Sequence, residues 1–248
     1  MSSVPQMAVA RMGRGPAPGN ALLTRYFYLA MSLLTAAIVV WGFSHTVEQS
    51  LFHPAVPRPL ILWFHGAAFS GWVLFFILQS ALVRTRNVKV HRKLGWFGAG
   101  LGTVMVPLGV TTSIVMGRFD IHRLHEDGIE AFLIIPFYDM LAFGVFLGLA
   151  IWWRRKPELH RRLIFLATCG LLDAAFGRID FLFNNNLFFA CIDLMIVAGM
   201  ARDLLVERRV HRVYVAALPA LAVAQCFVNV VWRSNAGWWL AIAHRILG

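Results

Sequence analysis

Charged residues are scarce in this sequence. Asp, Glu, Lys and Arg make up 14% of its 248 residues, and the acidic residues number only 12. A water-soluble domain carries about 25% charged residues, so the composition excludes an ordinary soluble enzyme. An apolar share of 59% excludes a disordered chain as well. The three cysteines all lie inside apolar segments and provide no disulfide framework.

Long apolar runs recur along the chain. A helix that crosses the hydrocarbon core of a bilayer, about 30 Å thick, needs roughly 20 apolar residues. We therefore predict an all-α, polytopic membrane protein: a seven-transmembrane-helix bundle that occupies residues 26–232, between a flexible cytoplasmic tail at 1–25 and an interfacial amphipathic tail at 233–248. The seven spans are expected at residues 26–44, 60–82, 96–116, 132–153, 163–182, 186–205 and 213–232.

Basic residues give the chain a net charge of +11, and most of the 23 lie in alternate connections between the predicted spans. Basic loops stay in the cytoplasm. We therefore predict a multi-pass protein of the inner membrane with its N-terminus in the cytoplasm and its C-terminus outside. The positive charge reports orientation in the lipid bilayer and predicts no nucleic-acid partner.

Three predicted helices begin with a His-Arg pair, in the motifs VHRKLG, LHRRLI and VHRVYV. The longer runs HGAAFSGWVLFFILQSALVRTRNVKVHRKLGWFG and ELHRRLIFLATCGLLDAAFGR resemble a widespread family of uncharacterised bacterial multi-pass membrane proteins. The resemblance extends from Tyr26 to Arg178 and implies the seven-helix architecture, without an activity. The histidines placed on the central helices carry a looser likeness to membrane b-type cytochromes.

The histidines of these motifs are His91, His160 and His211, and all three are expected at one depth, at the cytoplasmic edge of the membrane. Histidines at one depth on facing helices are the usual axial ligands of haem b in a bundle. If haem binds, we expect its ligands to come from these three. The alternative is that each His-Arg pair anchors a helix entry at the lipid headgroups.

Several ionisable residues fall inside the predicted spans. Such groups are costly in a membrane and mark functional sites by default. We expect the set to converge around a hydrated pocket in the outer half of the bundle, with Arg178 paired to Asp139 or Asp193; the alternative is a series of structural ties between helices. The proposed proton-handling and binding residues are His65, Asp139, Asp173, Arg178 and Asp193.

One predicted loop, FDIHRLHEDGIE, places His122 and His125 three residues apart among carboxylates, a weak signal for Zn²⁺ or a similar metal. A solvated polar loop explains the same pattern. No pattern in the sequence designates catalytic residues or an oligomeric state.

Four functions remain open at this point. The first is a protein that binds or transports a small amphiphile or ion with proton coupling. The second is a haem b membrane oxidoreductase. The third is an accessory subunit of a membrane complex without chemistry of its own, and the fourth is an enzyme whose buried acid protonates a lipid-like substrate.

Overall fold

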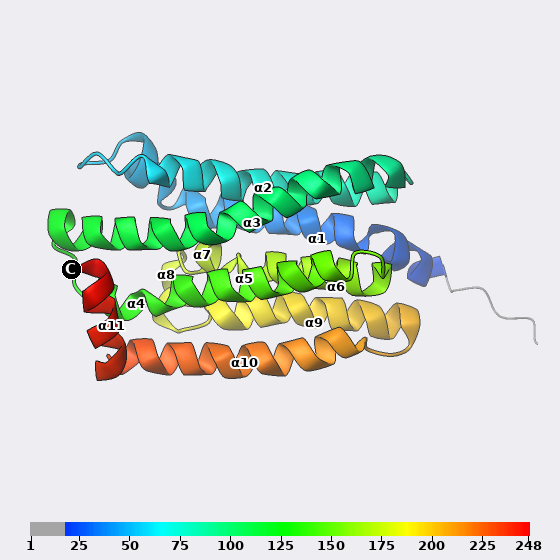
Figure 1. Ribbon diagram of the computed structural model, residues 1–248. Coiled ribbons are helices and arrows are strands. Elements are labelled where there is room, and N and C mark those ends of the chain that lie inside the picture. Colours follow the sequence, from blue (N-terminus) through cyan, green and yellow to red (C-terminus); the bar gives the residue numbers. More distant parts are fainter. Residues whose placement is uncertain (1–17) are drawn as a thin grey trace, which may run out of the picture.

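The computed structural model describes residues 18–248, and all regular structure in that part of the chain is helical (Figure 1). Residues 1–17 of the predicted tail lie outside this range, and the first helix already begins at Pro18. The elements are α1 (Pro18–Ser44), η1 (Glu48–Phe52), α2 (Ile61–Arg84), α3 (Val88–Phe119), η2 (Asp120–Leu124), α4 (Ile129–Phe132), α5 (Ile134–Trp152), α6 (Pro157–Gly170), α7 (Asp173–Phe176), α8 (Asp180–Asn184), α9 (Phe188–Glu207), α10 (Arg212–Arg233) and α11 (Gly237–Leu247), where η marks a π-helical turn.

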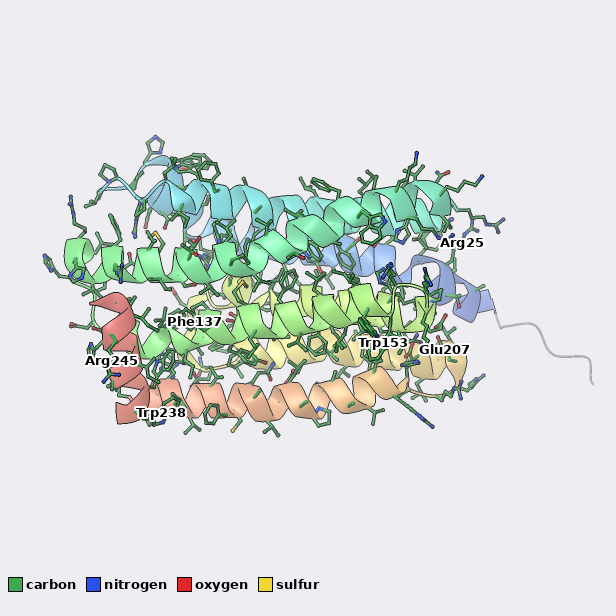
Figure 2. All side chains as sticks on the ribbon, in the orientation of Figure 1. Arg25, Phe137, Trp153, Glu207, Trp238 and Arg245 are labelled. Carbon is green, nitrogen blue, oxygen red and sulfur yellow. The ribbon has the colours of Figure 1, made fainter. Side chains whose placement is uncertain are left out.

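The long helices lie side by side in one elongated bundle, and α11 crosses one end of it (Figure 1). We call this the α11 end. The opposite end, where α1 begins and the turns between α2 and α3 and between α9 and α10 lie, is called the basic end. Figure 2 shows Arg25 and Glu207 at the basic end, and Trp238 and Arg245 at the α11 end.

Five helical segments are long and apolar enough to cross a membrane. The prediction of an all-helical chain with several membrane-length apolar helices is therefore confirmed for residues 18–248, whereas the count of seven is not. The five segments are Ala21–Ser44, Ile61–Arg84, Val88–Leu124, Ile129–Trp152 and Arg212–Arg233.

The surface of the bundle is strongly apolar. Val40, Leu74 and Val223 are each exposed over about two thirds of their area or more, at 71%, 67% and 71%. Large exposed apolar side chains of this kind suit contact with lipid and are a liability in water. Exposed tryptophans lie toward both ends, such as Trp41 near the end of α1 and Trp152 at the end of α5. Tryptophan favours both interfaces of a bilayer.

The predicted continuous span at 163–182 is wrong, because this segment folds as the three short helices α6, α7 and α8. At the first break the backbone changes to the tighter 3₁₀ pattern, in which Leu172 N–H donates to Cys169 O and Ala175 N–H donates to Leu172 O, each at 3.0 Å. Gly170 and Gly177 stand at the two breaks, and glycine is a poor helix former. With 14 residues, α6 is also only about 21 Å long at 1.5 Å per residue.

The C-terminal tail is helical, as an amphipathic segment requires, and it packs against the end of the bundle. Trp239, Ala243 and Leu247 are buried there. The Trp239 indole N–H donates to two backbone carbonyls, of Glu130 at 3.0 Å and of Ala131 at 3.2 Å. These contacts fix α11 across the start of α4.

A buried ion pair joins α6 to α9 near the basic end. The Arg162 guanidinium donates from Nε and Nη2 to the two carboxylate oxygens of Asp203, both at 2.7 Å, and neither side chain is exposed. A bidentate pair of this kind is the strongest form of the arginine–carboxylate interaction. It compensates a charge on each helix that is costly to bury alone.

Four more charged side chains complete this cluster, which we call the Arg162 network. Glu207 accepts from Arg162 at 2.7 Å and from Arg202 at 2.6 Å, and Arg202 also donates to Asp203 at 2.9 Å. Burial raises the pKa of Glu207, but hydrogen bonds from Arg202 and from Arg162 outweigh it and hold the pKa below its ordinary value. Its stabilising contribution is therefore present above the ordinary carboxyl pKa and is lost as the pH falls through the lowered value. The members are Glu158, Arg161, Arg162, Arg202, Asp203 and Glu207.

The Arg162 network predicts a large stability effect. Asp203→Ala leaves Arg162 buried without its main partner, which costs about 3–5 kcal/mol in proteins. We expect a clear fall in the thermal unfolding temperature in detergent, whereas Glu48→Ala, which breaks an exposed pair with His53, should cost less than about 1 kcal/mol. Equal effects of the two substitutions would contradict a structural role for the network.

Candidate functional site

Two buried carboxyl groups meet in the interior of the bundle. Asp139 on α5 and Asp173 at the start of α7 are 8% and 6% exposed, and their carboxyl groups lie close enough to interact electrostatically. Two ionised carboxylates this close in a buried site repel each other, so the protonated form of one of them is favoured. We call these two groups the Asp139–Asp173 pair.

The break in the helix places Asp173 at this position. α7 packs closely on α1, where a Cβ atom on Gly42 would lie 2.3 Å from the backbone oxygen of Ala175. Only a glycine lets the two backbones approach to this distance. Gly42 thus allows α7 to pack closely on α1, and this packing fixes the position of Asp173 relative to α5.

A small pocket of about 10 Å³ adjoins Asp139, between α5, α6, α9 and α10, and Tyr138 and Gln225 also line it. Its volume is about what one water molecule needs. Tyr138 and Gln225 face the same pocket, and the Gln225 amide donates to Asp193 Oδ1 at 3.3 Å. Polar groups therefore continue from the pair to Asp193 on α9.

A larger pocket of about 80 Å³ adjoins Asp173 on the other side. The Oδ1 atom of Asp173 is buried and has no hydrogen-bond partner within residues 18–248. Ala174, which also lines the pocket, is exposed, so the pocket reaches the surface of the bundle. The lining residues are Phe132, Ile135, Asp173, Ala174, Gly177, Arg178, Phe183 and Phe188.

Arg178 contributes the positive charge of the larger pocket, but the expected ion pair with Asp139 or Asp193 is wrong. Its Nε donates to Thr46 Oγ1 at 3.0 Å, its Nη1 donates to the Ala174 carbonyl, and its guanidinium carbon lies 4.0 Å from the ring centre of Phe43. Beyond the break that follows α7, Arg178 therefore lies against α1.

The five predicted site residues come together to different degrees. Asp139 and Asp173 are close enough to interact, Asp193 is hydrogen-bonded to Gln225, which shares the smaller pocket with Asp139, and Arg178 shares the larger pocket with Asp173. His65 stacks on Phe69 with ring centres 4.0 Å apart, and the charge of Arg178 acts on it. Its Nδ1 atom has no partner in the described part of the chain.

The sequence reasoning did not single out Tyr138, Thr46 or the Arg162 network as parts of the interior. Tyr138 directly precedes Asp139 in the sequence, so a polar side chain next to the buried acid could have been noticed. The network carries a local signal too, since Glu158 and Arg162 stand four residues apart on α6. Nothing in the sequence pairs Thr46 with Arg178, because the two are 132 residues apart.

The three proposed haem ligands differ in their surroundings. His91 and His160 are neighbours, with ring centres 6.4 Å apart, and His160 Nδ1 lies 2.9 Å from the Ala150 carbonyl oxygen. His211 instead caps α10, because its Nδ1 accepts from the Val213 N–H. Burial and the nearby Arg162 lower the pKa of His211, which places it beside the Arg162 network.

The proposed metal ligands His122 and His125 are not part of a cluster that could hold a metal ion in the part of the chain that the structure describes. His122 lies in η2 and His125 directly follows it with a left-handed backbone, φ 56°. Within residues 18–248 no group of three or more His, Cys, Asp or Glu side chains is arranged to hold a metal ion.

Comparison of the chain with protein-family models, with curated proteins and with solved structures finds no match. The resemblance to a bacterial membrane family therefore stays a prediction.

The close contact of α1 with α7 gives a prediction about the site. Gly42→Ala should force α7 away from α1 and cost about 1–3 kcal/mol, the usual cost of overpacking. Gly66→Ala on α2 is the matched control, since a Cβ atom there meets nothing within 4 Å. Thermal unfolding of the two purified variants measures the difference, and an unchanged Gly42→Ala protein would refute the assigned role of the glycine.

Proposed function

We propose that this chain is an integral protein of the inner membrane that binds or transports a small amphiphile or ion, and that the Asp139–Asp173 pair exchanges a proton during this work. One observation carries the proposal: two buried carboxyl groups that interact with each other each border a pocket. A structural tie would join a donor to an acceptor, whereas two neighbouring buried acids favour a bound proton.

The arrangement supports a proton route. Asp173 borders the larger pocket and Asp139 borders the smaller one, so a proton that enters at either side reaches the pair directly. Beyond the smaller pocket, Tyr138 and Gln225 lead to Asp193. Chains of acids and hydroxyl groups at membrane depth are typical proton relays.

The broken helix supports the same proposal. Irregular backbone within a membrane is tolerated where it lines a cavity, and interrupted helices form the substrate sites of many transporters. Here Gly170, at the first break, lines the smaller pocket, and Gly177, at the second, lines the larger one. Both breaks in the helix therefore border a pocket, as the interrupted helices of transporters border their substrate sites.

Haem b oxidoreduction is the second candidate, and the 6.4 Å separation of the His91 and His160 rings favours it. An absorption spectrum of the purified protein distinguishes the two functions. A Soret band that disappears in His91→Ala and His160→Ala, and persists in His65→Ala, would support haem at the basic end.

The proposal includes an orientation, with the basic end in the cytoplasm. Reporter fusions after Gly117, at the α11 end, and after Val206, at the basic end, should report opposite sides of the membrane. We expect the Val206 fusion to be cytoplasmic. An external Val206 fusion would invert the orientation.

Proton exchange by the pair is tested by the conservative variants Asp139→Asn and Asp173→Asn. Each replaces one carboxyl by an amide of the same shape and removes the shared proton. We expect the infrared band of a buried protonated carboxyl to disappear and proton-coupled turnover to fall by about tenfold or more, as loss of a general acid–base group does. Asp180→Asn, at an exposed acid on α8, is the control and should behave as the original protein. A band that survives both substitutions would refute the shared proton.

A further inference from the structure

We propose that the larger pocket binds the carboxylate of a short monocarboxylic acid, with its hydrocarbon end among the phenylalanine rings. This inference rests on the proposed function and names its substrate class. The pocket combines one cation, one buried acid and an otherwise apolar lining, which is the chemistry of a small amphiphilic anion.

The polar side of the pocket is incomplete without a ligand. Asp173 is 6% exposed and lines the pocket, yet its Oδ1 atom has no partner within the described residues. Arg178 donates from Nε and Nη1 to Thr46 and Ala174, and no hydrogen bond from its Nη2 to any of residues 18–248 is formed. One donor of the guanidinium and one carboxyl oxygen of the acid are therefore available to the same pocket.

The apolar side excludes a bare inorganic ion as the preferred occupant. Phe132, Phe183 and Phe188 lie around the pocket together with Ile135, and Phe183 stacks on Phe188 with ring centres 6.1 Å apart. Rings of this kind contribute favourable contacts only to a ligand that carries carbon. A carboxylate with a short alkyl chain satisfies both sides of the pocket.

The size of the pocket limits the length of that chain. A protein cavity of about 150 Å³ binds benzene, which has six carbon atoms. The larger pocket measures about 80 Å³, roughly half as much. By the same proportion it encloses about three non-hydrogen atoms, so acetate fills it, the end of propionate extends toward the exposed mouth beside Ala174, and a fatty acid does not fit.

Charge decides how the ligand binds. The carboxylate is attracted by Arg178 but meets an acceptor in Asp173 unless that acid is protonated and donates its O–H. Binding of the anion therefore adds a proton to the Asp139–Asp173 pair beyond the one that it already holds, and the anion and this added proton leave together when the ligand is released. Anion and proton move as a neutral unit, and affinity should rise as the pH falls.

The other side chains around the Asp139–Asp173 pair are neutral or lie farther from the pocket, so we assign proton uptake to the pair. From α1 the neutral side chains Phe43 and Thr46 face Arg178, and α10 contributes the neutral Gln225. The remaining titratable groups that act on Asp173, Arg178 or their neighbours are Tyr138 and Asp139 on α5, Asp193 on α9 and His65 on α2.

Equilibrium binding of radiolabelled acetate and propionate to the purified full-length protein tests the inference. We expect saturable binding that strengthens at lower pH and weakens about tenfold or more in Arg178→Gln. Because Arg178 also contacts α1, Ala174→Leu is a second variant: it fills the exposed mouth of the pocket and should block binding while the protein stays folded. Arg154→Gln, which removes an exposed charge beside Trp96 outside the pocket, is the control and should bind normally.

Three results overturn the inference: no binding of either acid, equal binding of chloride, or full binding by Ala174→Leu. Proton uptake, measured in the same samples with a pH indicator, separates this inference from the proposed function. Acetate binding without proton uptake would keep the carboxylate site and refute proton coupling. A carboxyl infrared band that responds to pH, together with absence of acetate binding, would keep the proton site and refute the carboxylate ligand.

Discussion

The bidentate pair of Arg162 with Asp203 is the interaction on which the arrangement of the second half of the bundle depends. Neither α6 nor α9 is among the apolar segments that can cross a membrane by composition alone. Each carries a fully buried charge, and each charge is compensated by the other helix at 2.7 Å. Because the unpaired charge would cost several kcal/mol, the two helices occupy the interior only together.

The fixed start of α6 has consequences at its other end. With only 14 residues, α6 ends before the segment has crossed the bundle, and the chain continues as the short α7. There the contact of Gly42 with the backbone of Ala175 holds α7 against α1. Asp173 is the first residue of the short α7, and its carboxyl lies near Asp139 on the much longer α5.

The sequence predicts the apolar helices well, because hydrophobicity over about 20 residues is a local property. It fails for residues 163–182, where hydrophobicity stays high but two glycines and a change to tighter hydrogen bonds break the helix. The expected partner of Arg178 fails for the same reason. A rotation of 100° per residue holds only within one helix, and the break gives Arg178 contacts with Thr46 and Phe43 on α1. The acids themselves were identifiable, since charge inside an apolar run is visible without a structure.

The two buried polar clusters differ in one respect that separates structure from function. In the Arg162 network three arginines face three acids, and every ionic charge has an opposite partner. At the Asp139–Asp173 pair two acids face each other, and Arg178 is directed at neutral groups. The charges of the first cluster compensate one another in a low dielectric, whereas two adjacent buried acids favour a bound proton. This difference is the observation on which the proposed proton exchange rests.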